Sequence, residues 1–173
     1  MSGGIIGWEG GKATGLETVG LEYFIEGNFT SAVSMAYAME KGLKKFYLLL
    51  AEKTDSPENK ELLNYMAKLE DGHMAKLSGQ YSEVALEKEK SSDAIAEGGV
   101  TVDDFLKTFE GHLTNISSVI QVGMMFESQA YDLYSRLAHK ADDSALKSFY
   151  LNMAQEEKNH LERLGKELSK RLA

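Results

Sequence analysis

Two copies of a Glu-x-x-His motif, Glu70 to His73 and Glu157 to His160, are the residues of this chain best suited to chemistry. On a helix, a spacing of three places the carboxylate and the imidazole on one face. Each pair can then present one oxygen and one nitrogen to a metal ion. The chain has no cysteine, which excludes thiolate zinc sites, iron–sulfur clusters and rubredoxin-type iron. Any metal must therefore be bound by oxygen and nitrogen.

Both motifs belong to an internal repeat. Residues 36–77 align with residues 123–164 without a gap, and about a dozen positions are identical. The repeat also pairs Glu40 with Glu127, so each copy contributes a further carboxylate. We therefore predict four glutamates and two histidines as one set of metal ligands.

The hydrophobic pattern predicts an all-α fold. Apolar residues recur at helical spacing, and we expect long helices at about 30–54, 57–80, 115–141 and 143–172. Ser56 can cap the second of these, with Pro57 in its first position. A short helix is expected after Thr101, within a connection of roughly 30 residues. Two helical hairpins joined by a long crossover are typical of a ferritin-like four-helix bundle.

Helix geometry predicts that the carboxylates lie level with one another. Glu40 and Glu70 each lie about 20 Å from the turn between their helices at ~1.5 Å per residue. An antiparallel hairpin therefore brings them to the same height, and the repeat applies the same reasoning to Glu127 and Glu157. Four buried carboxylates would repel one another, whereas two divalent ions would neutralise them.

Composition limits the class of protein. A length of 173 residues suits one domain, which we place at 21–173 behind a Gly-rich arm or linker at 1–20. The net charge of −8 argues against nucleic acid or an anionic membrane as partner. The sequence contains neither a membrane span nor a signal peptide, so a cytoplasmic protein is expected.

Across residues 30–170 the chain resembles the rubrerythrins of the ferritin-like superfamily, on the residues Glu40, Glu70, His73, Glu127, Glu157 and His160. The resemblance implies a centre of two iron ions, with Glu70 and Glu157 bridging and Glu40 and Glu127 terminal. It also implies a homodimer that reacts with hydrogen peroxide or dioxygen in oxidative-stress defence. Manganese or zinc would accept the same ligands.

The chain departs from the rubrerythrin pattern in two places. It has no cysteine for a rubredoxin iron, so repeated turnover would need an external electron donor. The family's additional glutamate, one turn after the third-helix ligand, is replaced by Ala130, which weakens the expectation of efficient peroxidase activity. The N-terminal segment GGIIGWEG is similar to the end of a rhodanese domain, a domain that some rubrerythrin-like proteins carry upstream, and the sequence leaves open whether one precedes this chain.

Several alternatives remain open from the sequence alone. The same site could serve ferrous oxidation, storage or delivery without sustained turnover, or the bundle could be a structural module. Tyr47 and Tyr134, seven residues after Glu40 and Glu127, could hydrogen-bond to ligand carboxylates or pack in the core. The methionines follow helical spacing and are expected to fill the core. His112 and His139 lie outside the repeat and are expected to be structural or surface residues.

Overall fold

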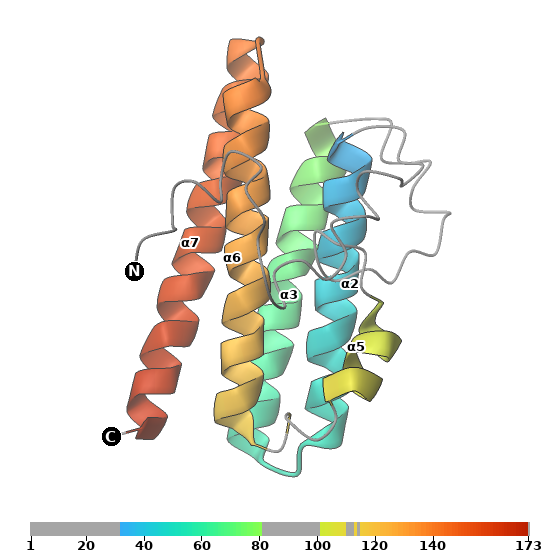
Figure 1. Ribbon diagram of the computed structural model, residues 1–173, viewed down its shortest axis with the longest axis vertical. Helices are drawn as coiled ribbons and strands as arrows, with labels where there is room; N and C mark the ends of the chain where they lie inside the picture. The colour runs from blue at the N-terminus through green and yellow to red at the C-terminus, as the bar shows by residue number, and fades with distance from the viewer. Residues whose placement is uncertain (1–31, 81–100, 110–112, 114, 173) are drawn as a thin grey trace.

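The computed structural model describes residues 32–80, 101–109, 113 and 115–172. The helices are α2 (Ala32–Lys53), α3 (Pro57–Gln80), α5 (Val102–Phe109), α6 (Ile116–Lys140) and α7 (Ser144–Leu172). The four long helices form one bundle (Figure 1), and their bounds lie within two residues of those expected. The predicted all-α, ferritin-like fold is confirmed.

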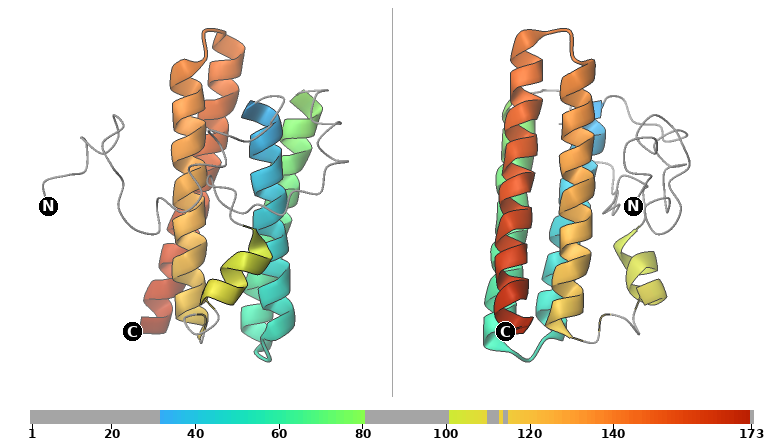
Figure 2. Two further views of the ribbon diagram at one scale, coloured as in Figure 1. Left: turned by 45° about the vertical axis from the view of Figure 1, so that its right-hand side comes forward. Right: turned by 60° about the vertical axis from the view of Figure 1, so that its left-hand side comes forward.

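The bundle consists of two antiparallel hairpins, α2 with α3 and α6 with α7, lying side by side (Figures 1 and 2). The end of α3 and the start of α6 lie at opposite ends of the bundle (Figure 1). The connection between the hairpins must therefore span the bundle's length, so α3 and α6 run parallel. This is the predicted crossover topology, and it differs from a simple up-and-down bundle.

Polar side chains cap the starts of α3, α6 and α7, and Ser56 is the cap that the sequence suggested. Ser56 Oγ accepts a hydrogen bond from a main-chain amide three residues on, at 3.3 Å, with Pro57 as the first residue of α3. Asn115 Oδ1 accepts from the Ser118 amide at 2.9 Å and caps α6. Asp143 does the same for α7 at 2.7 Å. These bonds satisfy amides that have no partner within the helix, and so they fix where each hairpin turns.

Two apolar clusters fill the bundle on either side of its centre. One cluster includes the edge-to-face rings of Phe46, Phe105 and Phe126, through which α5 packs against the long helices. The other includes Tyr134 and Tyr150, near the turn between α6 and α7. Met39, Met66 and Met153 are buried in these clusters, which confirms a core role for them. The apolar packing holds all four helices rigidly around the bundle centre.

Other expectations fall at the surface or outside the described residues. His139 is exposed in the last turn of α6, as expected for a surface histidine. The predicted arm at 1–20, its rhodanese-like segment and His112 lie outside the described residues. Among the helices of the described part, none is long and apolar enough to cross a membrane.

Candidate metal centre

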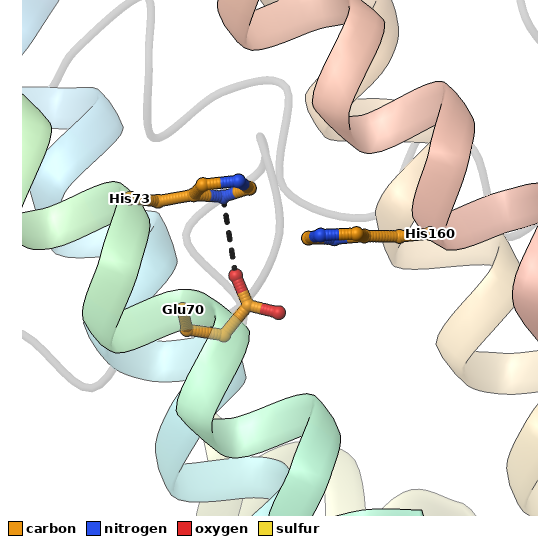
Figure 3. A group of neighbouring side chains, drawn as sticks. All are labelled: Glu70, His73 and His160. Atoms are coloured by element: carbon orange, nitrogen blue, oxygen red, sulfur yellow. Dashed lines mark ion pairs between the residues drawn. The ribbon is translucent and has the colours of Figure 1, made fainter.

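All six predicted ligands meet at the centre of the bundle, between the two hairpins. Their exposed fractions range from 0 % to 7 %. His73 on α3 and His160 on α7 point toward one another, with the Glu70 carboxylate beside them (Figure 3). The two imidazole rings are stacked, with centroids 4.9 Å apart and planes inclined by 11°. The repeat has thus produced a site with approximate twofold character, one histidine from each hairpin.

His73 faces three carboxylates with a single nitrogen. Its Nδ1 lies 3.1 Å from Glu157, 3.4 Å from Glu40 and 3.5 Å from Glu70. A ring nitrogen carries at most one proton, so it can donate to only one of these groups at a time. The surplus of carboxylate oxygen around His73 calls for a further cation.

His160 has a matching environment. Its Nδ1 lies 3.1 Å from Glu127 and 3.3 Å from Glu157. Glu157 therefore directs one oxygen toward each imidazole, Oε1 to His73 and Oε2 to His160. The Glu157 carboxylate lies between the two halves of the site.

Three groups of donor atoms within 4.8 Å of one another could each hold a metal ion. One contains Glu40 with His73 and Glu157, a second contains Glu127 with Glu157 and His160, and a third contains Glu70 with both histidines. Glu70 and Glu157 thus lie near both histidines, whereas Glu40 lies near His73 alone and Glu127 near His160 alone. This placement suits the bridging and terminal roles that the resemblance implied.

Two tyrosines join the hairpins across the site. Tyr47 on α2 donates a hydrogen bond to Glu127 of α6 at 2.8 Å, and Tyr134 on α6 donates one to Glu40 of α2. Burial, followed by the nearby carboxylates, raises the pKa of both phenols well above 10. Both hydroxyls therefore remain protonated donors, and each holds the carboxylate of the opposite hairpin.

The excess of carboxylate over imidazole is the strongest indication that this cluster binds cations. The oxygens of Glu70 and Glu157 are buried, and their nearest polar partners are shared imidazoles: Nδ1 of His73 lies 3.5 Å from Glu70 and 3.1 Å from Glu157, and Nδ1 of His160 lies 3.3 Å from Glu157. Burial is the main cause that raises the pKa of Glu70 well above its ordinary value. Two imidazoles can balance at most two of the four buried carboxylates of the cluster, and buried charge that is left unbalanced costs several kcal/mol. Carboxylate and imidazole donors together fit iron, manganese or zinc.

Comparison with known proteins decides the family. The family model described as Rubrerythrin matches residues 32–168, which contain α2, α3 and α6 completely and all of α7 except its last four residues. The chain belongs to the rubrerythrin family. No curated protein and no solved structure matches it significantly. Rubrerythrins are di-iron carboxylate proteins, and in this chain the matched residues contain the whole Glu and His cluster.

Glu156 is a residue of this rubrerythrin site that the sequence did not reveal. Its Oε2 lies 3.2 Å from Nε2 of His73, and it also pairs with Lys76. The repeat aligns Glu156 with Leu69, so comparison of the two copies carried no signal for a carboxylate here.

Gly123 gives Tyr47 the room to reach its carboxylate. A Cβ on Gly123 would lie 3.1 Å from the Tyr47 hydroxyl and 3.3 Å from Cδ1 of Leu164. Gly123→Ala should therefore displace Tyr47 from Glu127 and destabilise the bundle by about 1–3 kcal/mol, as overpacking does. Chemical denaturation of the metal-free protein would measure this loss.

Gly72→Ala is the matched control for Gly123→Ala. Gly72 also lies within a helix, but a Cβ there meets nothing within 4 Å. This substitution should stabilise the protein by about 0.5–1 kcal/mol because alanine is the better helix former. Equal effects of the two substitutions would contradict the close packing of Tyr47.

Metal uptake by this rubrerythrin should release protons at neutral pH. Burial alone lowers the pKa of His160, but hydrogen bonds to Glu127 and Glu157 outweigh it and raise that pKa to about 9. For His73, burial is likewise outweighed, chiefly by the Glu40 charge, and the pKa is raised. Metal ligation requires neutral imidazole and ionised carboxylate, so filling both positions at pH 7 should release about two protons from the imidazoles, and more from Glu70, whose pKa is raised. Calorimetry in buffers of different ionisation enthalpy would count them, and no release would contradict the protonated state.

The same shifts predict how pH affects the metal-free bundle. An unfolded histidine has a pKa near 6.5. The stabilisation from His160 is therefore complete below about pH 6.5 and lost as the pH rises through about 9. The melting temperature of metal-free protein should fall between about pH 7 and pH 10, whereas bound ions should remove this decline. A metal-free melting temperature that rises over this range would contradict the assignment.

Proposed function

We propose that this chain binds two iron ions at the central cluster and acts as an oxidoreductase toward hydrogen peroxide or dioxygen. The observation that carries the proposal is the excess of four buried glutamates over two buried imidazoles, with Glu70 and Glu157 within 3.5 Å of imidazole nitrogens that they share. Family membership supports iron as the metal. A role in oxidative-stress defence, in the cytoplasm and as a homodimer, forms part of the same proposal.

Each residue of the cluster has a distinct task in this proposal. Glu40 and His73 would hold one ion and Glu127 and His160 the other, while Glu70 and Glu157 would bridge them. Tyr47 and Tyr134 orient the terminal carboxylates by donating hydrogen bonds across the hairpins, as their contacts with Glu127 and Glu40 support.

Two bound ferrous ions would supply two electrons which, with two protons, reduce one hydrogen peroxide to two waters. The surrounding helices exclude bulk water from the ligand residues, which are at most 7 % exposed, and so limit side reactions. Return to the ferrous state needs two electrons from an external donor, because the chain has no cysteine to bind a rubredoxin iron.

Anaerobic oxidation tests this function directly. The protein is loaded with ferrous iron, freed of excess metal, and mixed with one equivalent of hydrogen peroxide while the optical spectrum is recorded. The proposal expects rapid oxidation of two irons per peroxide and a ferric absorption band that disappears on reduction and returns when peroxide is added again. A fully loaded site that peroxide and dioxygen both leave ferrous would overturn it.

Ala130 favours a second function that uses the same ions. This residue is 2 % exposed in α6, at the position where the rubrerythrins place an additional glutamate, and its methyl group offers no donor. The alternative is ferrous oxidation for storage or delivery, without sustained peroxide turnover. Oxidised iron that accumulates well beyond two ions per chain, or passes to an acceptor chelator, would favour this alternative. Tight binding of two ions without any redox change would favour a structural role.

A further inference from the structure

The two histidines of the cluster differ in what lies behind them. Nε2 of His73, the nitrogen turned away from the central carboxylates, lies 3.2 Å from Glu156 of α7. Glu156 also pairs with Lys76 of α3. The side chains of Glu156 and Lys76 are 34 % and 48 % exposed, so this pair links the buried imidazole to the protein surface.

The second half of the repeat lacks this arrangement. Leu69 occupies the position that corresponds to Glu156, and Arg163 the position that corresponds to Lys76. Arg163 lies over the ring of Tyr65, 3.8 Å from its centroid. Within the described part of the chain, the carboxylates that pair with His160 do so through Nδ1, and none pairs with its Nε2.

A hydrogen bond at Nε2 of an imidazole affects how well its Nδ1 binds a metal ion. An imidazole that donates its Nε2–H to a carboxylate keeps the Nδ1 lone pair free for a metal, in a fixed ring orientation. The carboxylate also makes the imidazole a stronger donor. His73 has this support from Glu156, whereas His160 must be held by its contacts inside the cluster.

We infer that the two metal positions are inequivalent and that the position at His73 binds its ion more tightly, because Glu156 orients and polarises that imidazole. This inference rests on the proposed metal centre. Loss of such an outer partner lowers metal affinity by about 10–100-fold, so removal of Glu156 should weaken one of the two binding steps by that factor.

Zinc titration of the metal-free protein against a chromophoric chelator measures both steps without redox chemistry. Wild-type protein should show two stepwise dissociation constants, and Glu156→Ala should raise the lower one by about 10–100-fold. Glu162→Ala is the matched control, since Glu162 is an exposed glutamate on the same helix. It should leave both constants within about twofold. The melting temperature of metal-free Glu156→Ala should change by no more than about 4 °C, as for other partly exposed pairs.

Single-histidine backgrounds assign the effect to one position. In His160→Ala, which keeps His73, Glu156→Ala should still weaken the remaining ion by about 10–100-fold. In His73→Ala, which keeps His160, Glu156→Ala should change the affinity for the remaining ion by less than about twofold. The reason is that the imidazole with which Glu156 pairs is already absent in this double-mutant cycle. Equal effects in both backgrounds would overturn the inference.

Two further results keep the inference testable if a histidine variant loses all metal. In wild-type protein with one equivalent of zinc, the imidazole NMR signals of His73 should shift before those of His160. Simultaneous shifts, or the opposite order, would overturn it. Leu69→Glu, which places a carboxylate at the corresponding position, should tighten the weaker step. A wild-type chain that takes up no zinc would instead refute the metal centre itself, whereas two ions unaffected by Glu156→Ala would refute the inequivalence alone.

Discussion

Glu70→Gln should abolish tight metal binding while leaving the bundle folded. Gln keeps the shape of the side chain but removes the charge and one of the two bridging oxygens. Even the loss of an outer hydrogen-bond partner costs about 10–100-fold in metal affinity, so loss of a ligand that reaches both sides of the site should exceed about 100-fold. Equilibrium dialysis followed by elemental analysis would measure the binding.

The stability of the metal-free variant gives an independent test of the same claim. The Glu70 carboxylate is buried, and burial raises its pKa. Its ionised form therefore costs stability above its unfolded pKa of about 4.3. Metal-free Glu70→Gln should be at least as stable as wild type at pH 7. The control is Glu61→Gln, an exposed position on the same helix, which should retain full metal binding. The role assigned to Glu70 would be refuted if Glu70→Gln bound metal as tightly as wild type. It would also be refuted if the metal-free variant failed to fold.

Removal of metal should lower the melting temperature by at least about 15 °C. Each ion present at 1,000 times its dissociation constant stabilises the folded state by about 4 kcal/mol. Two such ions contribute about 8 kcal/mol, and each kcal/mol shifts the melting temperature by about 2–4 °C in a domain of this size. The large effect follows because the ions neutralise four carboxylates that otherwise face one another in the core.

Thermal unfolding of the loaded protein with and without a chelator measures this shift. Glu70→Gln serves as the control, because a variant that binds no metal should unfold at the same temperature in both conditions. A wild-type protein whose melting temperature is indifferent to chelator and to added metal would show that the cluster does not couple metal binding to folding.

The sequence predicted the metal cluster because its signals are periodic. Glu70 and His73 share a helix face by their spacing alone, and the repeat places Glu157 and His160 in the same register. Helix lengths and turn positions then determine that the four carboxylates lie level. None of these inferences requires knowledge of how far apart the two hairpins are.

Features that depend on the distance between hairpins could not be predicted in the same way. Tyr47 lies two turns from Glu40 on its own helix, yet it donates to Glu127 of the other hairpin. That choice depends on the close approach allowed by Gly123, which is a matter of packing rather than periodicity. The role of Glu156 could not be predicted for a related reason, since its contact with His73 joins α7 to α3 and has no counterpart in the repeat.

Metal content tests the central claim most directly. Wild-type protein and Glu70→Gln would be produced side by side in iron-supplemented medium, purified without added metal or chelator, and analysed for metal per chain. The account predicts about two ions per wild-type chain, chiefly iron, and close to none in Glu70→Gln, as expected for a site with this ligand set. A wild-type protein that carries no metal and takes up none on addition of ferrous iron would contradict the account.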